Sequence, residues 1–209
     1  MAVLWDKFYP YIQPYLPGCP EVVIETHLKE AAADFLARSE IWRFDIDKDF
    51  TTASEKDYEL DTPTGAVLEN IYDLVLDDQP LARVSDRHIN GTRFNTNGRP
   101  RYYSIYQDTL IRLYPTPDQK YTFHGVGVLK ASLAATGVEN WIYETHGRCI
   151  SYGAVSRLAE VPGKEWYNPE LASYYRSKFD MDADMAKSRD YRRVNLRVGS
   201  RSFDGVRRY

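Results

Sequence analysis

Apolar residues between residues 21 and 39 recur at the spacing of one helix face. They lie at i, i+4, i+7 and i+11, as Ile24, Leu28, Ala31 and Phe35. This spacing predicts an amphipathic helix that buries the stripe. Pro20 suits the first helical position, because its missing N–H leaves no hydrogen bond unmade there. The prolines before it exclude a longer regular helix in the first 19 residues.

The period of the pattern changes at Trp42. Bulky and polar residues then alternate, which predicts a strand, and further strands follow up to about residue 136. Turns are expected at Asp77-Asp78 and near Gln107-Asp108. The paired glycines Gly125 and Gly127 predict a bulge or a close backbone approach within the last long strand.

Helical spacing returns after Gly137 and predicts two more helices, over 141–159 and 169–191. The small residues Gly147, Gly153 and Ala154 allow another helix to approach the first of them closely. Asn168 is a good N-cap for the second helix, with Pro169 in its first turn. A broad stripe is expected on that helix, formed by Leu171, Tyr175, Phe179, Met185 and Ala186.

The order of elements predicts an α+β protein. One N-terminal and two C-terminal helices form a helical bundle, an antiparallel β domain is inserted between them, and an extended C-terminal arm follows. The expected divisions are 1–40, 41–136, 137–191 and 192–209, as one compact unit plus the arm. The arm shows no helical stripe, and all its basic residues are arginines.

Charge is divided unevenly along the chain. Of 27 basic and 30 acidic residues, eight basic and two acidic ones lie from Lys187 onward, so the net charge is −9 before that residue and +6 from it to the end. Such a division suggests different partners for the two parts. The chain has 17 tyrosines, which is more than usual. Tyrosine suits surfaces that are partly exposed to water, such as interfaces, although many of these residues can simply face outward on strands.

Candidate chemistry is sparse. The histidines, His27, His88, His124 and His146, show no metal-binding spacing, and no phosphate-binding or dinucleotide motif occurs, so we expect no metal and no cofactor. Cys19 and Cys149 are predicted to be reduced core residues. No apolar run is long enough to span a bilayer, and the first residues do not resemble a signal peptide.

Two classes of function besides a structural one stay open at this point. The basic arm is compatible with nucleic-acid binding, although an acidic body repels a polyanion and a protein partner with an acidic groove fits equally well. The many carboxylates allow a cell-wall hydrolase, although alternating acids on strands are usually solvated surface.

Three segments carry a resemblance to a known family. They are "YLPGCPEVVIETHLKEAAADFLARSEIWR", "PRYYSIYQDTLIRLYPTPDQKYTF" and "GAVSRLAEVPGKEWYNPELASYYRSKF". Together they resemble the head-to-tail adaptor (connector) proteins of tailed bacteriophages, mainly the short-tailed, podovirus-like ones, over about residues 10–193. Small departures occur at Val155-Ser156 and Glu160-Val161.

The resemblance implies a structural virion protein and not an enzyme. Such adaptors form a ring, usually dodecameric, below the portal protein at the head–tail junction, after assembly in the host cytoplasm. Neighbouring subunits and a tail nozzle or tube protein are the other implied partners. DNA passes through the lumen during packaging and ejection without specific binding, and an acidic wall would keep it from sticking.

The resemblance also implies that the C-terminal arm grips the portal. The residues expected to do so are Arg192, Arg193, Arg197, Arg201, Phe203, Arg207, Arg208 and Tyr209. A second group is expected in subunit or bundle packing, namely Trp42, Trp141, Trp166, Tyr174, Tyr175 and Phe179.

Overall fold

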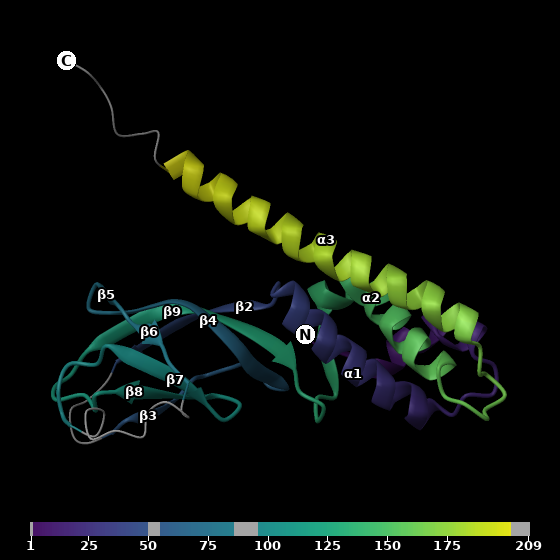
Figure 1. Cartoon of the computed structure of the whole chain (residues 1–209), viewed down its shortest axis with the longest axis horizontal. Coiled ribbons are helices and arrows are strands. Elements are labelled where there is room, and N and C mark those ends of the chain that lie inside the picture. Colours follow the sequence, from purple (N-terminus) through teal and green to yellow (C-terminus); the bar gives the residue numbers. More distant parts are fainter. Residues whose placement is uncertain (1, 50–54, 86–95, 202–209) are drawn as a thin grey trace, which may run out of the picture. The chain divides into compact units, whose positions relative to one another are not determined.

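The computed structural model describes residues 2–49, 55–85 and 96–201. The chain divides into two compact units. The first combines the residues up to 41 with those from 133 onward, and the second comprises residues 42–132. Helices dominate the first unit and antiparallel strands the second (Figure 1), which confirms the α+β class. The inserted β domain was expected over 41–136.

The first unit is a helical bundle. Its main helices are α1, Glu21–Ser39; α2, Asn140–Ala159; and α3, Pro169–Arg201. Two short 3₁₀ helices precede them, η1 at Trp5–Tyr11 and η2 at Gln13–Tyr15. A two-stranded sheet pairs β1, Ala2–Leu4, with β10, Gly137–Glu139, in antiparallel register.

The expected stripe of α1 forms part of the bundle core. Ile24, Leu28 and Phe35 are completely buried, so the spacing along the sequence predicted the buried face correctly. Pro20 takes the N-cap with an extended backbone instead of the first helical position. The helix ends where Glu40 adopts a left-handed conformation and returns its N–H to the carbonyl of Leu36.

The small residues of α2 permit the close approach that was expected. A Cβ atom on Gly153 would lie 2.7 Å from the ring of Phe179 on α3 and 3.0 Å from the Cβ of Ala31 on α1. The first distance is shorter than ordinary packing distances, and the second is at their lower limit. Gly153 therefore lies where the three helices meet.

The helix α3 differs from the prediction in its length. Asn168 caps it as expected, since its side-chain oxygen accepts a 3.0 Å hydrogen bond from the N–H of Leu171. The helix then continues past Tyr191 to Arg201, so residues 192–201 are helical and not an extended arm. Proline is absent from this stretch and its first glycine is Gly199, so nothing ends the helix earlier. Residues 202–209 lie outside the described part of the chain.

The second unit contains two four-stranded sheets. One has the strand order β2-β9-β4-β5 and the other β3-β8-β7-β6. The strands are β2, Arg43–Asp49; β3, Asp57–Glu59; β4, Ala66–Leu76; β5, Gln79–Pro80; β6, Ala82–Arg83; β7, Tyr102–Tyr106; β8, Leu110–Tyr114; and β9, Thr122–Ala131. The pairing of β6 with β7 is parallel, which departs from the purely antiparallel expectation.

The glycines of β9 make room for side chains from the neighbouring strands. Gly127 pairs with Phe44 of β2, and a Cβ atom there would lie 2.0 Å from the Phe44 ring. A Cβ atom on Gly125 would lie 3.1 Å from the side chain of Leu74 in β4, next to a shift in the β4–β9 register. Both glycines therefore mark the close approach and bulge that the sequence predicted.

Candidate assembly surface

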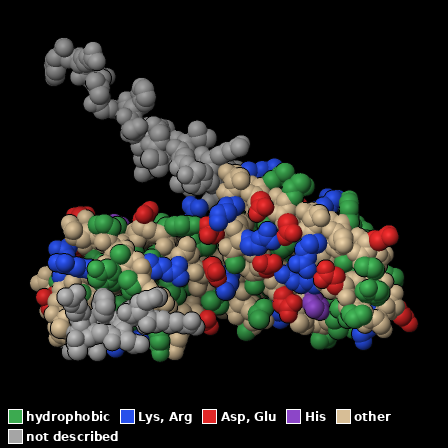
Figure 2. Space-filling view, viewed as in Figure 1, with side chains coloured by type: hydrophobic (Ala, Val, Ile, Leu, Met, Phe, Trp, Pro, Cys, Tyr) green, Lys and Arg blue, Asp and Glu red, His purple; other side chains and the backbone are tan. Residues whose placement is uncertain are grey.

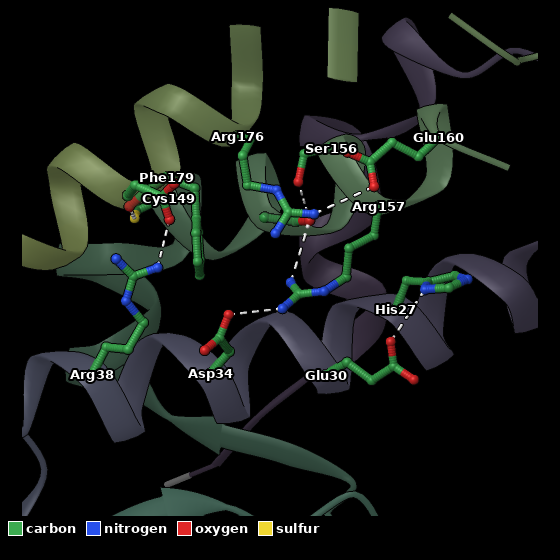
Figure 3. A network of polar contacts seen from close by, with 12 residues as sticks. His27, Glu30, Asp34, Arg38, Cys149, Ser156, Arg157, Glu160, Arg176 and Phe179 are labelled. Carbon is green, nitrogen blue, oxygen red and sulfur yellow. Dashed lines mark hydrogen bonds and ion pairs between the residues drawn. The ribbon is translucent and has the colours of Figure 1, made fainter. Parts of the chain in front are cut away.

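One face of the helical unit carries ion pairs that connect its three helices (Figure 3). Arg157 of α2 donates a 2.8 Å hydrogen bond to Asp34 of α1. Arg176 of α3 lies 3.3 Å from Glu160, just after the last residue of α2. The first pair joins α2 to α1, and the second joins α3 to the residue that caps α2.

The contact between α1 and α3 is ionic as well. Arg38 donates a hydrogen bond to Asp180, which raises the pKa of the guanidinium, and it also lies 3.7 Å from Asp184. Further along, Lys187 approaches Glu40 to 3.2 Å. Basic and acidic side chains alternate over the visible face of this unit in Figure 2. The ion pairs named here connect segments of the same chain and add to the packing of the bundle.

Two guanidinium groups flank the buried ring of Phe179. The Arg38 group lies 5.9 Å from the ring centroid and the Arg157 group 5.7 Å from it. Both distances are within the range of cation–π attraction. Phe179 therefore joins the ionic face to the apolar core.

A second feature of the unit is a cluster of four tyrosines. The ring of Tyr175 is buried and lies 5.1 Å from Tyr15, 5.0 Å from Tyr152 and 5.1 Å from Tyr174. Burial raises the pKa of Tyr175, and its hydrogen bond with Tyr15 raises it further. The ammonium group of Lys178 lies 4.7 Å from the Tyr174 ring and 5.5 Å from that of Tyr152.

Along α3 from this cluster, large apolar side chains face solvent. Tyr174 is 54% exposed, Met181 51% and Met185 43%. A shallow hollow beside the methionines is lined by Met181, Asp184, Met185, Ser188 and Arg189. Met185 was expected on the buried stripe of α3 and is exposed, because the stripe that packs on α1 and α2 runs instead through Tyr175, Phe179, Ala183 and Ala186.

The predicted packing residues do not form one site. Trp42 is buried in the second unit, and Trp141 is exposed at the start of α2, where its indole N–H donates to Glu139. Trp166 is half-buried, and its indole nitrogen has no hydrogen-bond partner among the described residues. Only Tyr174, Tyr175 and Phe179 come from one element, α3.

No prediction from the sequence made Tyr15, Tyr152, Lys178 or Met181 a site residue. The available signal was the spacing of residues 174, 178, 181 and 185, which places them on one face of a helix. Of the predicted arm residues, Arg192, Arg193, Arg197 and Arg201 belong to α3. The others, Phe203, Arg207, Arg208 and Tyr209, lie outside the described residues.

No group of three or more potential metal ligands occurs within the described ranges. None of the helices described here combines the length and hydrophobicity needed to cross a membrane. Both cysteines are free thiols, with Cys149 buried and Cys19 half-buried.

Comparison with known proteins gives one family. No curated protein matches the chain. A family model described as SU10 adaptor protein matches residues 12–201. This range includes α1, α2, α3 and the whole of the inserted β unit. The chain therefore belongs to the SU10 adaptor protein family, a family of structural, non-catalytic proteins of the phage head-to-tail junction.

Proposed function

We propose that this protein forms a ring below the portal of a phage head, joins the portal to the tail and extends the channel for DNA. The family match over residues 12–201 carries the proposal. An adaptor at this junction contacts the portal on one side and a tail nozzle or tube on the other. A closed ring requires each subunit to touch its neighbours with two different faces.

The portal-binding segment in this proposal is the C-terminal part of α3 together with the residues that follow it. Ala186 is the last buried residue of α3 in the part of the helix whose side chains are described. Beyond it the chain has a net charge of +6. Cations near a helix C-terminus are favoured by the helix dipole, and arginine pairs with carboxylates through a planar fork.

The helical structure changes how this segment presents its charge. Arg189, Arg193, Arg197 and Arg201 recur every four residues along α3. Positions at this interval share one face of a helix. The portal surface that fits such a segment is a groove with carboxylates, and the segment enters it as a helix instead of an extended strip.

DNA would pass such a ring without being bound. The body before Lys187 has a net charge of −9, and the same charge repeated around a ring repels a polyanion over about a Debye length, roughly 8 Å at physiological salt. This repulsion supports both packaging and ejection of the genome, because DNA does not adhere to the wall.

The test compares three forms of the full protein for binding to the portal of the same phage by co-sedimentation. One form lacks residues 194–209, one replaces Arg197, Arg201, Arg207 and Arg208 by glutamine, and the matched control replaces the same four by lysine. We expect the first two to lose portal binding and the lysine form to retain part of it. Unfolding should be unchanged in all three, and wild-type portal affinity of the truncated protein would overturn the role of this segment.

The same proteins distinguish an adaptor from a nucleic-acid-binding protein. Each is titrated with duplex DNA at several salt concentrations. The adaptor proposal expects no binding at physiological salt. Tight binding that falls steeply with salt and is lost on truncation, together with portal binding that survives truncation, would instead assign the segment to nucleic acid.

A further inference from the structure

One face of α3 is left uncovered within the helical unit. Its buried stripe, through Phe179 and Ala183, faces α1 and α2. Residues 174, 178, 181 and 185 follow one another at intervals of four, three and four, which is the spacing of a helix–helix seam. We name this row, Tyr174, Lys178, Met181 and Met185, the α3 seam.

The α3 seam exposes a large amount of apolar surface to solvent, which is energetically unfavourable. Three of its four members are large apolar side chains that are 43–54% exposed. Contiguous exposed apolar patches on soluble proteins mark interaction sites more often than plain surface. Methionine is well suited to such contacts, since its unbranched chain adapts to the shape of a partner.

Charges of both signs lie next to the seam. A hydrogen bond with Tyr174 raises the pKa of Lys178, and Asp182 is close enough to raise it further. Lys178 lies over the rings of Tyr174 and Tyr152, and Arg189 borders the hollow beside Met185. Asp184 is the acidic residue at the hollow, and it already lies 3.7 Å from Arg38 of the same chain. Lys178 is the charged member of the seam itself, so a partner that complements the seam at this point brings a carboxylate.

The outer side of α1 has the complementary character. Val22 is 77% exposed, and Thr26, Lys29 and Ala33 follow it at intervals of four, three and four. Lys29 is paired with Glu25 of the same helix at 2.8 Å, and Thr26 and Ala33 are small side chains. Their size leaves shallow holes for larger side chains. Glu21 is exposed beside them, and Glu30 is 44% exposed although it contacts His27.

We propose that the α3 seam of one subunit packs against the outer side of α1 of the next subunit, with Lys178 facing the carboxylates of that helix. The occupant is a second copy of this chain, so the inference rests on the proposed function and names the lateral contact of the ring. Two α3 seams packed on each other would bring like charges together, whereas the α1 side supplies opposite ones. Because the two faces differ, the contact is heterologous and can close into a ring.

The test reverses the charges at the two faces in the full-length protein. The variants are Lys178→Glu, Glu30→Lys and the double variant, and the matched control is Lys164→Glu, which makes the same charge change in the exposed loop before α3. Self-association is measured by sedimentation velocity over a concentration series, and ring completion by the number of subunits bound per portal. We expect each single reversal to weaken association by about tenfold or more. The double variant should recover much of that loss, and the control should behave as wild type.

Each outcome decides between the faces. Unchanged association of Lys178→Glu would overturn the role of the α3 seam. Loss in both single variants without recovery in the double variant would overturn α1 as the partner. Wild-type protein that neither self-associates nor assembles side by side on the portal would overturn the lateral contact altogether. Normal self-association without portal binding would leave the lateral contact standing and overturn the proposed function alone.

Discussion

The guanidinium of Arg157 donates a 2.8 Å hydrogen bond to the carboxylate of Asp34 and so connects α2 to α1. The same guanidinium lies against the ring of Phe179, which belongs to α3. One side chain therefore contacts two other helices by two kinds of interaction.

Removing the charge at either end of this pair should weaken the bundle by different amounts. Asp34→Asn removes only the ion pair, and partly exposed pairs contribute about 0.5–1 kcal/mol. Arg157→Gln also removes the contact with Phe179, so it should cost about 0.5–1 kcal/mol more. Urea unfolding of both single variants and the double variant gives the coupling energy, which should decrease in high salt. Equal losses in the two single variants would contradict the role of the ring contact.

A methyl group at Gly153 should destabilise the bundle even though alanine is the better helix former. The gain in helix propensity is about 1 kcal/mol, whereas overpacking a tight core costs about 1–3 kcal/mol. Gly153→Ala should therefore lower the free energy of unfolding, measured by thermal or urea denaturation. In a Phe179→Leu background, the change Gly153→Ala should cost less than it does in the wild type. The smaller side chain at residue 179 leaves space beside residue 153.

Gly147→Ala is the matched control for this prediction. There the nearest side-chain atom is Cδ2 of Tyr143 at 3.1 Å, on a half-buried ring that can shift. The change should be close to neutral. A larger loss at residue 147 than at residue 153 would show that the close approach of Phe179 is not what demands glycine.

The two cysteines should differ in reactivity. Burial, and next the carboxylate of Asp182, raises the pKa of the Cys149 thiol to about 12. Burial also raises the pKa of Cys19, but this residue is only half-buried. At pH 8 a thiol reagent should modify Cys19 in the native protein and leave Cys149 intact. In denaturant both should react, and in the Cys19→Ser variant rapid labelling should disappear.

His146 should make the stability of the protein fall in mild acid. Its ring lies 5.1 Å from that of Phe35, and burial, followed by the charge of Arg189, lowers its pKa. The unfolded state therefore binds a proton at a higher pH than the folded state does. The neutral ring's contribution to the free energy of unfolding is fully present above the ordinary histidine pKa of about 6.5. It decreases as the pH falls below that value.

The measurement for this prediction is the unfolding free energy from about pH 7.5 to about pH 5.5, across the ordinary histidine pKa. His146→Gln should lose part of the pH dependence that the wild type shows. His124→Gln, at an exposed position of β9, is the control and should leave the dependence unchanged. An identical slope in the wild type and in His146→Gln would contradict the assignment.

Local patterns predicted the elements that local forces determine. The stripe through Leu28 and Phe35 defined α1, and Asn168 marked the start of α3, because helix periodicity and capping act within a few residues. The turn at Asp77-Asp78 also follows β4 as expected. Pairings between distant segments were not foreseen. The parallel pairing of β6 with β7 and the pairing of β1 with β10 depend on contacts that form only in the folded chain.

The candidate surface was predicted only in part for a related reason. Tyr175 and Phe179 belong to the expected stripe, but Met185 was assigned to that stripe as well. A helix with apolar residues on two faces does not reveal from its sequence which face is inside. The packing of α3 on α1 and α2, with Phe179 beside Gly153, determines which side of α3 is buried and which is left for a partner.

The division of the helical unit on either side of the inserted strands has a consequence for synthesis on the ribosome. Apart from η1, the segments that cover α1 are α2 and α3, and both follow residue 132. The β unit is therefore complete and able to fold while α1 still lacks its partners. Much of the apolar side of α1 therefore stays uncovered until first α2 and then α3 has left the exit tunnel.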